Sequence, residues 1–246
     1  MSKPYILVKY ASRSRADRFL AGLQNIYDFT KDHEQIRVLV TADIDDKSMC
    51  NDTMRDVIEA YPNCKVIYGT SEGKIHAINR DMEILPDDFK DWSVVANFSD
   101  DMRWVFYGWE QIVLADFGQT FPDYDGFMAY LDPDTKGHLS TLYIAGRKFY
   151  DRFGFIYDPC FKSLFCDNLT EDCARHLGLY AFQNHQIYHH YNSSYGYQDF
   201  PADNMYLEQQ QIRDTITQII DQYTKKLEIK SIRELDNLSL NEFYRK

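Results

Sequence analysis

Cysteines and long apolar runs are both scarce in this sequence. Its 246 residues contain five cysteines, an odd number, and no two of them form a CxxC pair. We find no signal peptide and no apolar run long enough to span a membrane. These absences argue against a disulfide-stapled secreted fold and a CxxC redox site, and they predict a cytoplasmic protein with reduced thiols.

Positive charge is also in short supply. Lysine and arginine number 27 against 38 aspartates and glutamates, which gives a net charge of −11. A chain this acidic has no broad attraction to nucleic acid or to an anionic membrane. The sequence also lacks internal repeats and low-complexity linkers, and its 44% hydrophobic content is ample for one large core with a small appendage.

Strand and helix patterns alternate over the first two thirds of the sequence. Apolar residues at helical spacing separate the strand-like runs, which favours an α/β fold with a Rossmann-like, nucleotide-binding half. The strands are expected over residues 4–10, 36–41, 64–68 and 92–98.

The pattern changes after residue 125. Short, aromatic, antiparallel-looking strands are expected over 125–131 and 139–144. A loop rich in His, Tyr, Asn and Ser covers 185–203, and its aromatic content predicts that it packs against the protein. An amphipathic helix is expected over 207–227.

Two carboxylates, Asp100 and Asp101, directly follow the apolar run 92–98. Ligands in open α/β sheets gather at the carboxyl ends of strands, and two adjacent acids there repel each other unless a cation lies between them. Oxygen ligands suit Mg²⁺ or Mn²⁺, which often arrive with a substrate's phosphates. The alternative is a solvated turn in which an aspartate caps a helix.

Seven short segments carry a resemblance to a known family through their order and spacing. The sequence resembles the nucleotide-sugar glycosyltransferases of the GT-A fold, family 2, and in particular an uncharacterised bacterial and phage group. The resemblance runs from residue 6 to about residue 203. The segments are 9–15, 43–49, 73–80, 99–102, 146–154, 166–168 and 189–190.

The resemblance implies a nucleotide site along the strand ends. It makes Asp43 the acceptor of a hydrogen bond from the N–H edge of uracil, and Asp100 the residue that contacts the ribose. The alternative for Asp43 is that it caps the next turn, and for Lys74 that it is a solvated helix residue. The full set of nucleotide-binding candidates is Ser12, Arg13, Arg15, Asp43, Lys74, Asn79, Ser99 and Asp100.

The resemblance also implies a metal ion, Mn²⁺ or Mg²⁺, that bridges the two phosphates of the donor. Its implied ligands are Asp101 and a histidine of a late loop, which His190 matches. The related group has a second histidine where this chain has Asn192. If His190 points away from the site, the neighbouring His189 becomes the candidate.

The implied catalytic base is Asp167, which lies eleven residues before Gly178. The related group has a glutamate where this chain has Leu169, and Glu171, two residues further on, is the alternative base. A purely structural interpretation is that Asp167 or Asn168 caps a helix and Glu171 completes a capping box. The same resemblance places Asp132 and Asp134, with 125–126, in the region that shapes the sugar and acceptor pocket.

These features together predict a metal-dependent, inverting glycosyltransferase that takes its sugar from a UDP-linked donor. We expect a GT-A domain over 1–204, with a nucleotide-binding half over 1–102 and a sugar and acceptor half over 103–204. A helical extension over 205–246 could form a homodimer. The acceptor stays open between a glycan, a lipid-linked glycan, a protein and a modified nucleic acid.

Two rival functions remain at this stage. A nucleotidyltransferase also places acidic pairs beside a nucleotide, but the loop after the first strand reads Ala-Ser-Arg-Ser-Arg and is not the Gly-rich, Lys-ended loop that such enzymes carry. A catalytically degenerate protein that only binds sugar nucleotides is the other, and turnover of a donor would separate it from an enzyme.

Overall fold

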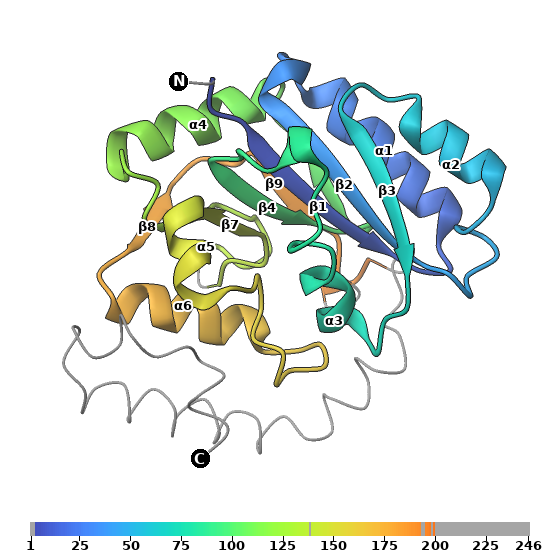
Figure 1. Ribbon diagram of the computed structural model, residues 1–246. Helices are drawn as coiled ribbons and strands as arrows, with labels where there is room; N and C mark the ends of the chain where they lie inside the picture. Colours follow the sequence, from blue (N-terminus) through green and yellow to red (C-terminus); the bar gives the residue numbers. More distant parts are fainter. Residues whose placement is uncertain (1–2, 138, 193–194, 198, 200–246) are drawn as a thin grey trace.

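A seven-stranded mixed sheet forms the centre of the protein, with strands in the order β3-β2-β1-β4-β7-β6-β8, and a second sheet pairs β5 with β9 (Figure 1). The computed structural model describes residues 3–137, 139–192, 195–197 and 199. The helix expected over 207–227, the extension 205–246 and the homodimer proposed through it lie outside these described residues.

The first half of the chain builds the parallel part of the large sheet. Strand β1 pairs in parallel with both β2 and β4, and β2 pairs in parallel with β3. The carboxyl ends of these strands therefore share one edge of the sheet. The elements are β1 (Ile6–Ser12), α1 (Ala16–Phe29), η1 (His33–Gln35), β2 (Ile36–Asp43), α2 (Asp52–Glu59), β3 (Cys64–Gly69), α3 (Lys74–Asn79), η2 (Asp87–Phe89) and β4 (Val94–Phe98).

The second half adds strands of both directions. Strand β7 runs antiparallel to β4 and β6, and β6 runs parallel to β8. The end of β6 therefore opens on the same edge as the ends of β1 to β4. The elements are β5 (Met102–Trp104), α4 (Trp109–Thr120), β6 (Phe127–Tyr130), β7 (Tyr143–Gly146), α5 (Arg147–Phe153), α6 (Cys166–His176), β8 (Tyr180–Gln183) and β9 (Tyr188–His190).

Two expectations for this half differ from the structure. The strand expected over 139–144 is observed as β7, Tyr143–Gly146. Residues 185–203 are expected as a loop, but 188–190 form strand β9 and pair with β5 in antiparallel register. Three residues are too few to give a readable alternation, and only the partner strand reveals them. The pairing matters because it brings His190 opposite Met102, next to the acidic pair.

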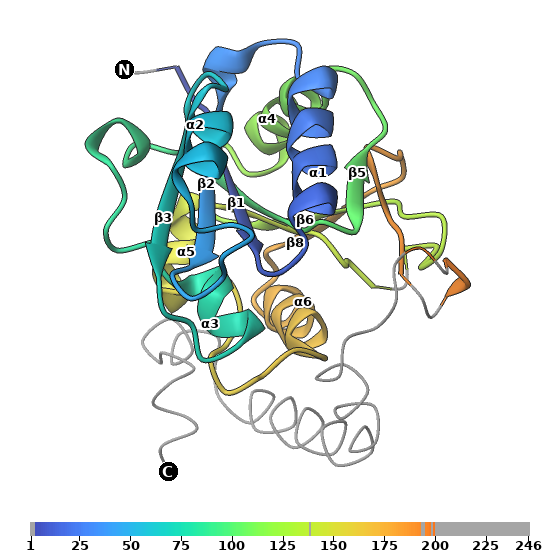
Figure 2. The same cartoon turned by 90° about the vertical axis from the view of Figure 1, so that its right-hand side faces the viewer.

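Helices cover both faces of the large sheet (Figure 2). Side chains of α1, α2 and α4 pack in one apolar cluster, and those of α3, α5 and α6 pack in another. Trp104 and Trp109 are fully buried in the first of these clusters and stack with ring centroids 3.6 Å apart. Among the described residues, no helix combines the length and the apolar character that crossing a bilayer requires.

Candidate functional site

The candidate site lies along the edge where β1, β2 and β4 end. Ser12 ends β1, Asp43 ends β2, and the acidic pair follows β4 by two residues. Strand β2 is longer than expected from the sequence, so that Asp43 is its last residue and not part of the following loop. The buried hydroxyl of Ser12 has no hydrogen-bond partner within the described part of the chain. A ligand bound at this edge can supply that partner.

Asp43 lies between two arginines. Nη1 of Arg13 donates to its Oδ2 at 2.6 Å, and Nη1 of Arg80 lies 3.3 Å from its Oδ1. Arg13 also forms a two-pronged bond to Asp45, at 2.6 and 2.9 Å. The hydrogen bonds to Asp45 and then to Asp43 raise the pKa of Arg13 further above its usual range. We call Arg13, Asp43, Asp45 and Arg80 the Asp43 corner.

A buried charge network lies directly behind the Asp43 corner. Nε of Arg80 lies 3.2 Å from Asp81, whose other oxygen accepts a bond of 2.6 Å from the hydroxyl of Thr41. Lys9, in the middle of β1 and fully buried, donates to Thr41 and lies 3.8 Å from Asp81. Burial lowers the pKa of Lys9 to about 7, against the opposing pull of Asp81. The sequence analysis did not identify Arg80 or Lys9 as part of the site. For Lys9, the available signal was a lysine within an otherwise apolar strand.

Asp100 is buried and paired with one arginine. Nη1 of Arg15 donates to Oδ1 of Asp100 at 3.1 Å. Burial raises the pKa of Asp100, the charge of Arg15 opposes that rise, and the neighbouring Asp101 adds to it. A cation bound beside Asp100 would offset the repulsion that Asp101 exerts on its charge.

Asp101, the residue before β5, faces His190 at the end of β9, the strand that pairs with β5. Nε2 of His190 lies 3.4 Å from its Oδ2, and the hydroxyl of Ser99 donates to its Oδ1. Burial disfavours the charge of Asp101, but His190, Lys74 and Ser99 together hold its pKa well below the usual range. The structure therefore brings both expected metal ligands together, with His190 directed at the acidic pair.

Asp167 is the second residue of α6, and its Oδ1 accepts the backbone N–H of Asn168 at 3.0 Å. Burial raises its pKa, while Lys74 and His190 lower it. Lys74 and His190 also lower the pKa of Asp101, so the same two side chains influence both carboxylates. We call Asp101, Asp167, Lys74 and His190 the acidic centre.

Two candidates lie outside this arrangement. The side-chain amide of Asn79 donates to the carbonyl of Tyr157 at 2.6 Å and accepts from the backbone N–H groups of Ile156 and Tyr157. It therefore fastens α3 to residues 156–157. Glu171, the alternative base, accepts from the backbone N–H of Ser140 at 2.8 Å and pairs with Arg175 at 2.6 Å.

The structural alternative, a capping box at the start of α6, is not formed. Helix α6 begins at Cys166, so that Asp167 and Asn168 both lie inside the helix. Its N-cap residue, Phe165, has a positive φ of 68° and makes no side-chain capping bond. The earlier start places Asp167 in the first turn of the helix, where the helix dipole favours a negative charge.

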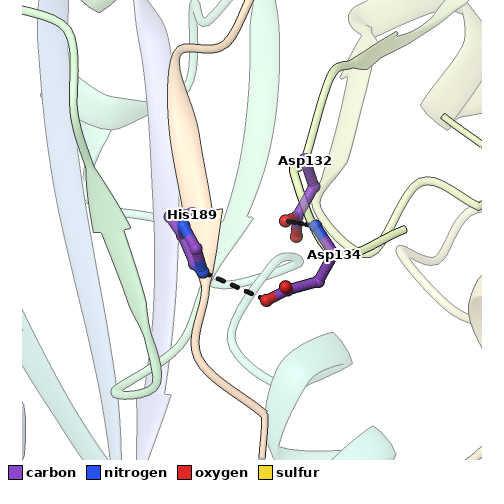
Figure 3. Close-up of side chains that lie close together, drawn as sticks. All are labelled: Asp132, Asp134 and His189. Carbon is purple, nitrogen blue, oxygen red and sulfur yellow. Dashed lines mark hydrogen bonds and ion pairs between the residues drawn. The ribbon is translucent and has the colours of Figure 1, made fainter. Parts of the chain in front are cut away.

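His189 faces a different group of side chains from His190. Figure 3 shows it opposite Asp132 and Asp134, which follow β6. Its Nε2 lies 3.1 Å from Oδ2 of Asp134 and 3.0 Å from the hydroxyl of Tyr197. One donor atom from each of the two aspartates and the histidine lies within 4.8 Å of the others. The sequence predicts Asp132 and Asp134 near the sugar and acceptor pocket, but not their approach to His189.

The protein is similar in structure to solved glycosyltransferases. The mannosyltransferase PcManGT from Pyrobaculum calidifontis, in complex with GDP-Man and Mn²⁺, matches with a TM-score of 0.59 and 15% identity over 80% of this chain and 59% of that one. S. aureus TarS 1–349, in complex with UDP-GlcNAc, matches with a TM-score of 0.60 and 12% identity over 82% of this chain and 60% of that one.

These similarities concern the fold. The chain spans 59–60% of the length of the two solved chains. No protein-family model and no curated protein matches the sequence. The strand order, the parallel edge with its acidic pair, and the two structural matches together show that this protein has a GT-A-like glycosyltransferase fold.

Proposed function

We propose that this protein is an inverting glycosyltransferase that transfers a sugar from a UDP-linked donor to a hydroxyl group. The observation that carries the proposal is the acidic centre. Asp101 and Asp167 come from different elements, yet the charges of Lys74 and His190 act on both. A carboxylate for the diphosphate side and a carboxylate for the acceptor side within one charged cluster is the arrangement that group transfer from a nucleotide sugar requires.

Asp101 and His190 would hold Mn²⁺ or Mg²⁺. Their donor atoms lie 3.4 Å apart, a spacing that adjacent ligands of one ion have. When bound, the ion would neutralise the leaving nucleoside diphosphate as a Lewis acid. Ser99 holds one oxygen of Asp101 by a hydrogen bond and so orients the other toward His190. A carboxylate and an imidazole leave further coordination positions for phosphate oxygens.

The Asp43 corner would receive the base of the nucleotide. Asp43 already has its charge balanced by Arg13 and Arg80, so that it can accept a hydrogen bond from a neutral N–H group without needing a further cation. Arg13 has a half-exposed side chain, and its planar guanidinium can stack on a base. Ser12, Arg15, Asp100 and Ser99 continue the same edge toward the ribose and phosphates.

Asp167 would act as the general base. Its pKa is raised by burial, which makes its carboxylate a stronger proton acceptor than a solvated one. The acceptor hydroxyl would give its proton to Asp167 while its oxygen attacks the anomeric carbon from the face opposite the diphosphate. The new bond forms as the bond to the diphosphate breaks, so that one displacement inverts the configuration.

The identity of the donor nucleotide is the most specific part of the proposal. The two structural neighbours were solved with different nucleotides, GDP-Man and UDP-GlcNAc, so the fold alone leaves the base open. The preference for UDP rests on Asp43 as an acceptor for the N–H edge of uracil. The acceptor stays within the classes of hydroxyl compounds that the sequence analysis left open: glycan, lipid-linked glycan, protein and modified nucleic acid.

A thermal-shift panel tests the proposed function. The full chain is heated with UDP-, GDP-, dTDP- and CMP-sugars, each with Mn²⁺ and with EDTA. We expect the largest rise in Tm with UDP-sugar and Mn²⁺ together, because a ligand that binds only the folded state stabilises it. Hydrolysis of the donor in the same samples then separates an enzyme from a binding protein. Equal shifts for all sugars, or none, contradict the proposal.

A further inference from the structure

The group formed by Asp132, Asp134 and His189, here the His189 cluster, joins two segments far apart in the sequence. The aspartates follow β6, and His189 lies in the middle of β9. Because successive side chains of a strand point to opposite faces, His189 and His190 leave β9 in opposite directions. The His189 cluster is therefore separate from the pair formed by Asp101 and His190.

The carboxylate of Asp132 is the unusual part of the His189 cluster. It is fully buried, and its hydrogen-bond donors are the backbone N–H of Asp134 at 3.1 Å and the hydroxyl of Thr141 at 3.4 Å. Within the described residues, neither aspartate of the cluster forms an ion pair with a lysine or an arginine. A buried carboxylate normally has a cation as a partner or coordinates a metal.

Other buried carboxylates of the same sheet edge have such a partner. Asp43 faces Arg13 and Arg80, and Asp100 faces Arg15. Asp132 instead accepts hydrogen bonds from neutral donors, the backbone N–H of Asp134 and the hydroxyl of Thr141. The carboxylate of Asp132 is therefore shielded from solvent, and no lysine or arginine among the described residues pairs with it.

The geometry of the His189 cluster suits one metal ion. Three donor atoms, one from each residue, lie within 4.8 Å of one another, and opposite ligands of a small divalent ion are about 4.2 Å apart. Figure 3 shows the two carboxylates and the imidazole directed toward a common space. A donor set of two carboxylates and one imidazole suits Mn²⁺ or Zn²⁺ better than Mg²⁺ or Ca²⁺, which prefer oxygen.

We propose that Asp132, Asp134 and His189 form a second metal site that binds a divalent transition-metal ion. The ion binds between Nε2 of His189 and Oδ2 of Asp134, which lie 3.1 Å apart in its absence, and a proton held between these two atoms is released to solvent when it binds. An occupied site ties the segment after β6 to β9, and β9 also carries His190. The proposal involves no nucleotide and does not rest on the proposed function.

Binding of Mn²⁺ alone to the full chain tests this site. The Asp101→Asn variant is titrated with Mn²⁺ without nucleotide, and the loss of the electron paramagnetic resonance signal of free Mn²⁺ reports binding. We expect this variant to keep one bound ion per chain. Adding Asp134→Asn or His189→Gln should weaken that binding by more than the about 10–100-fold that loss of an outer-sphere partner costs.

Asp116→Asn is the matched control. Asp116 lies 3.4 Å from Nε2 of His185, so it forms the same kind of contact without a second carboxylate, and its loss should leave Mn²⁺ binding unchanged. Circular dichroism verifies that each variant is folded, and His189→Gln replaces Asp134→Asn if the latter fails to fold. The proposal is overturned if Asp101→Asn abolishes all binding, or if the cluster variants bind Mn²⁺ as tightly as their parent.

Discussion

Asp43 and Asp101 occupy the same edge of the same sheet, but their surroundings differ in charge. Asp43 ends β2 between two arginines, at 2.6 and 3.3 Å, and both partners are permanent cations. Asp101 follows β4, and within the described residues its ion-pair partner is a histidine at 3.4 Å, which is charged only when protonated. Asp43 is thus in direct contact with permanent cations, whereas the ion-pair partner of Asp101 is a group whose charge depends on pH.

The difference indicates which ligand each aspartate can take. A balanced carboxylate keeps its capacity to accept a hydrogen bond but gains little from another cation, so that Asp43 suits a neutral N–H group. An unbalanced carboxylate next to an imidazole is a site for a divalent cation. The comparison also gives each aspartate its own test. A change around Asp43 should affect which base is selected, and a change around Asp101 should affect metal dependence.

The largest expected effect lies at the acceptor side of the acidic centre. Asp167→Asn keeps the shape of the side chain but removes the proton acceptor, so donor hydrolysis should slow by about 10²–10⁴-fold while donor binding survives. In the wild type, turnover should rise with pH as Asp167, whose pKa is raised, loses its proton. This rise should be absent in the variant.

Glu171→Gln is the control for this prediction. Glu171 is held by Ser140 and Arg175, so the change should lower stability and leave turnover largely intact. If Asp167→Asn hydrolyses the donor as fast as the wild type while Glu171→Gln does not, the base lies one helical turn further along α6.

A smaller effect is expected at the metal side. Asp101→Asn should remove the gain in UDP affinity that Mn²⁺ provides, by about 10–100-fold or more, because a lost ligand costs at least as much as a lost outer-sphere partner. His190→Ala should act in the same direction. Calorimetry with Mn²⁺ and with EDTA measures both. Equal affinity for UDP under the two conditions in the wild type would rule out the metal.

The Asp43 corner should respond differently. Arg80→Gln removes one of the two cations that hold Asp43, and the loss of a hydrogen bond to a charged group, about 1.5–3 kcal/mol, corresponds to about tenfold weaker UDP binding or more. The loss should be the same with EDTA as with Mn²⁺, and the preference for UDP over GDP should narrow. Arg147→Gln, which affects a surface pair with Asp151, is the control. If the loss of UDP affinity in Arg80→Gln depends on the metal, the distinction between the surroundings of Asp43 and those of Asp101 does not hold.

The sequence predicts the strand ends better than their partners. Asp43, Asp100 and Asp101 could be placed because they follow apolar runs, and the carboxyl ends of parallel strands share one edge. The α/β class, which rests on the alternating strand and helix patterns, is confirmed, and so is the GT-A-like fold, which rests on the family resemblance. The placement of the strand ends uses only local patterns and one general rule of topology.

The partners depend on tertiary contacts that no local pattern contains. Arg80 reaches Asp43 across 37 positions of the sequence. Strand β9 is visible only through its register with β5, and that register decides which histidine faces Asp101. Asn79 was expected at the nucleotide, but a distant backbone segment at 156–157 takes its amide. The local sequence around a residue therefore does not reveal which distant residue becomes its partner in the fold.

The last expected effect is on folding stability and not on ligand binding, and it concerns Lys9, which lies behind the Asp43 corner. Its pKa is lowered to about 7 by burial, whereas an unfolded chain keeps the proton up to about pH 10. Between these values the unfolded state binds more protons than the folded state, so stability should rise with pH, by at most about 1.4 kcal/mol per pH unit. Lys9→Met removes this contribution. Urea unfolding at pH 7, 8 and 9 should give a flatter dependence for Lys9→Met than for the wild type, whereas Lys90→Met, at an exposed lysine, should keep the wild-type slope. Equal slopes for Lys9→Met and the wild type would mean that Lys9 stays charged beside Asp81, and Asp81 would then share two permanent cations, Lys9 and Arg80, as Asp43 shares two arginines.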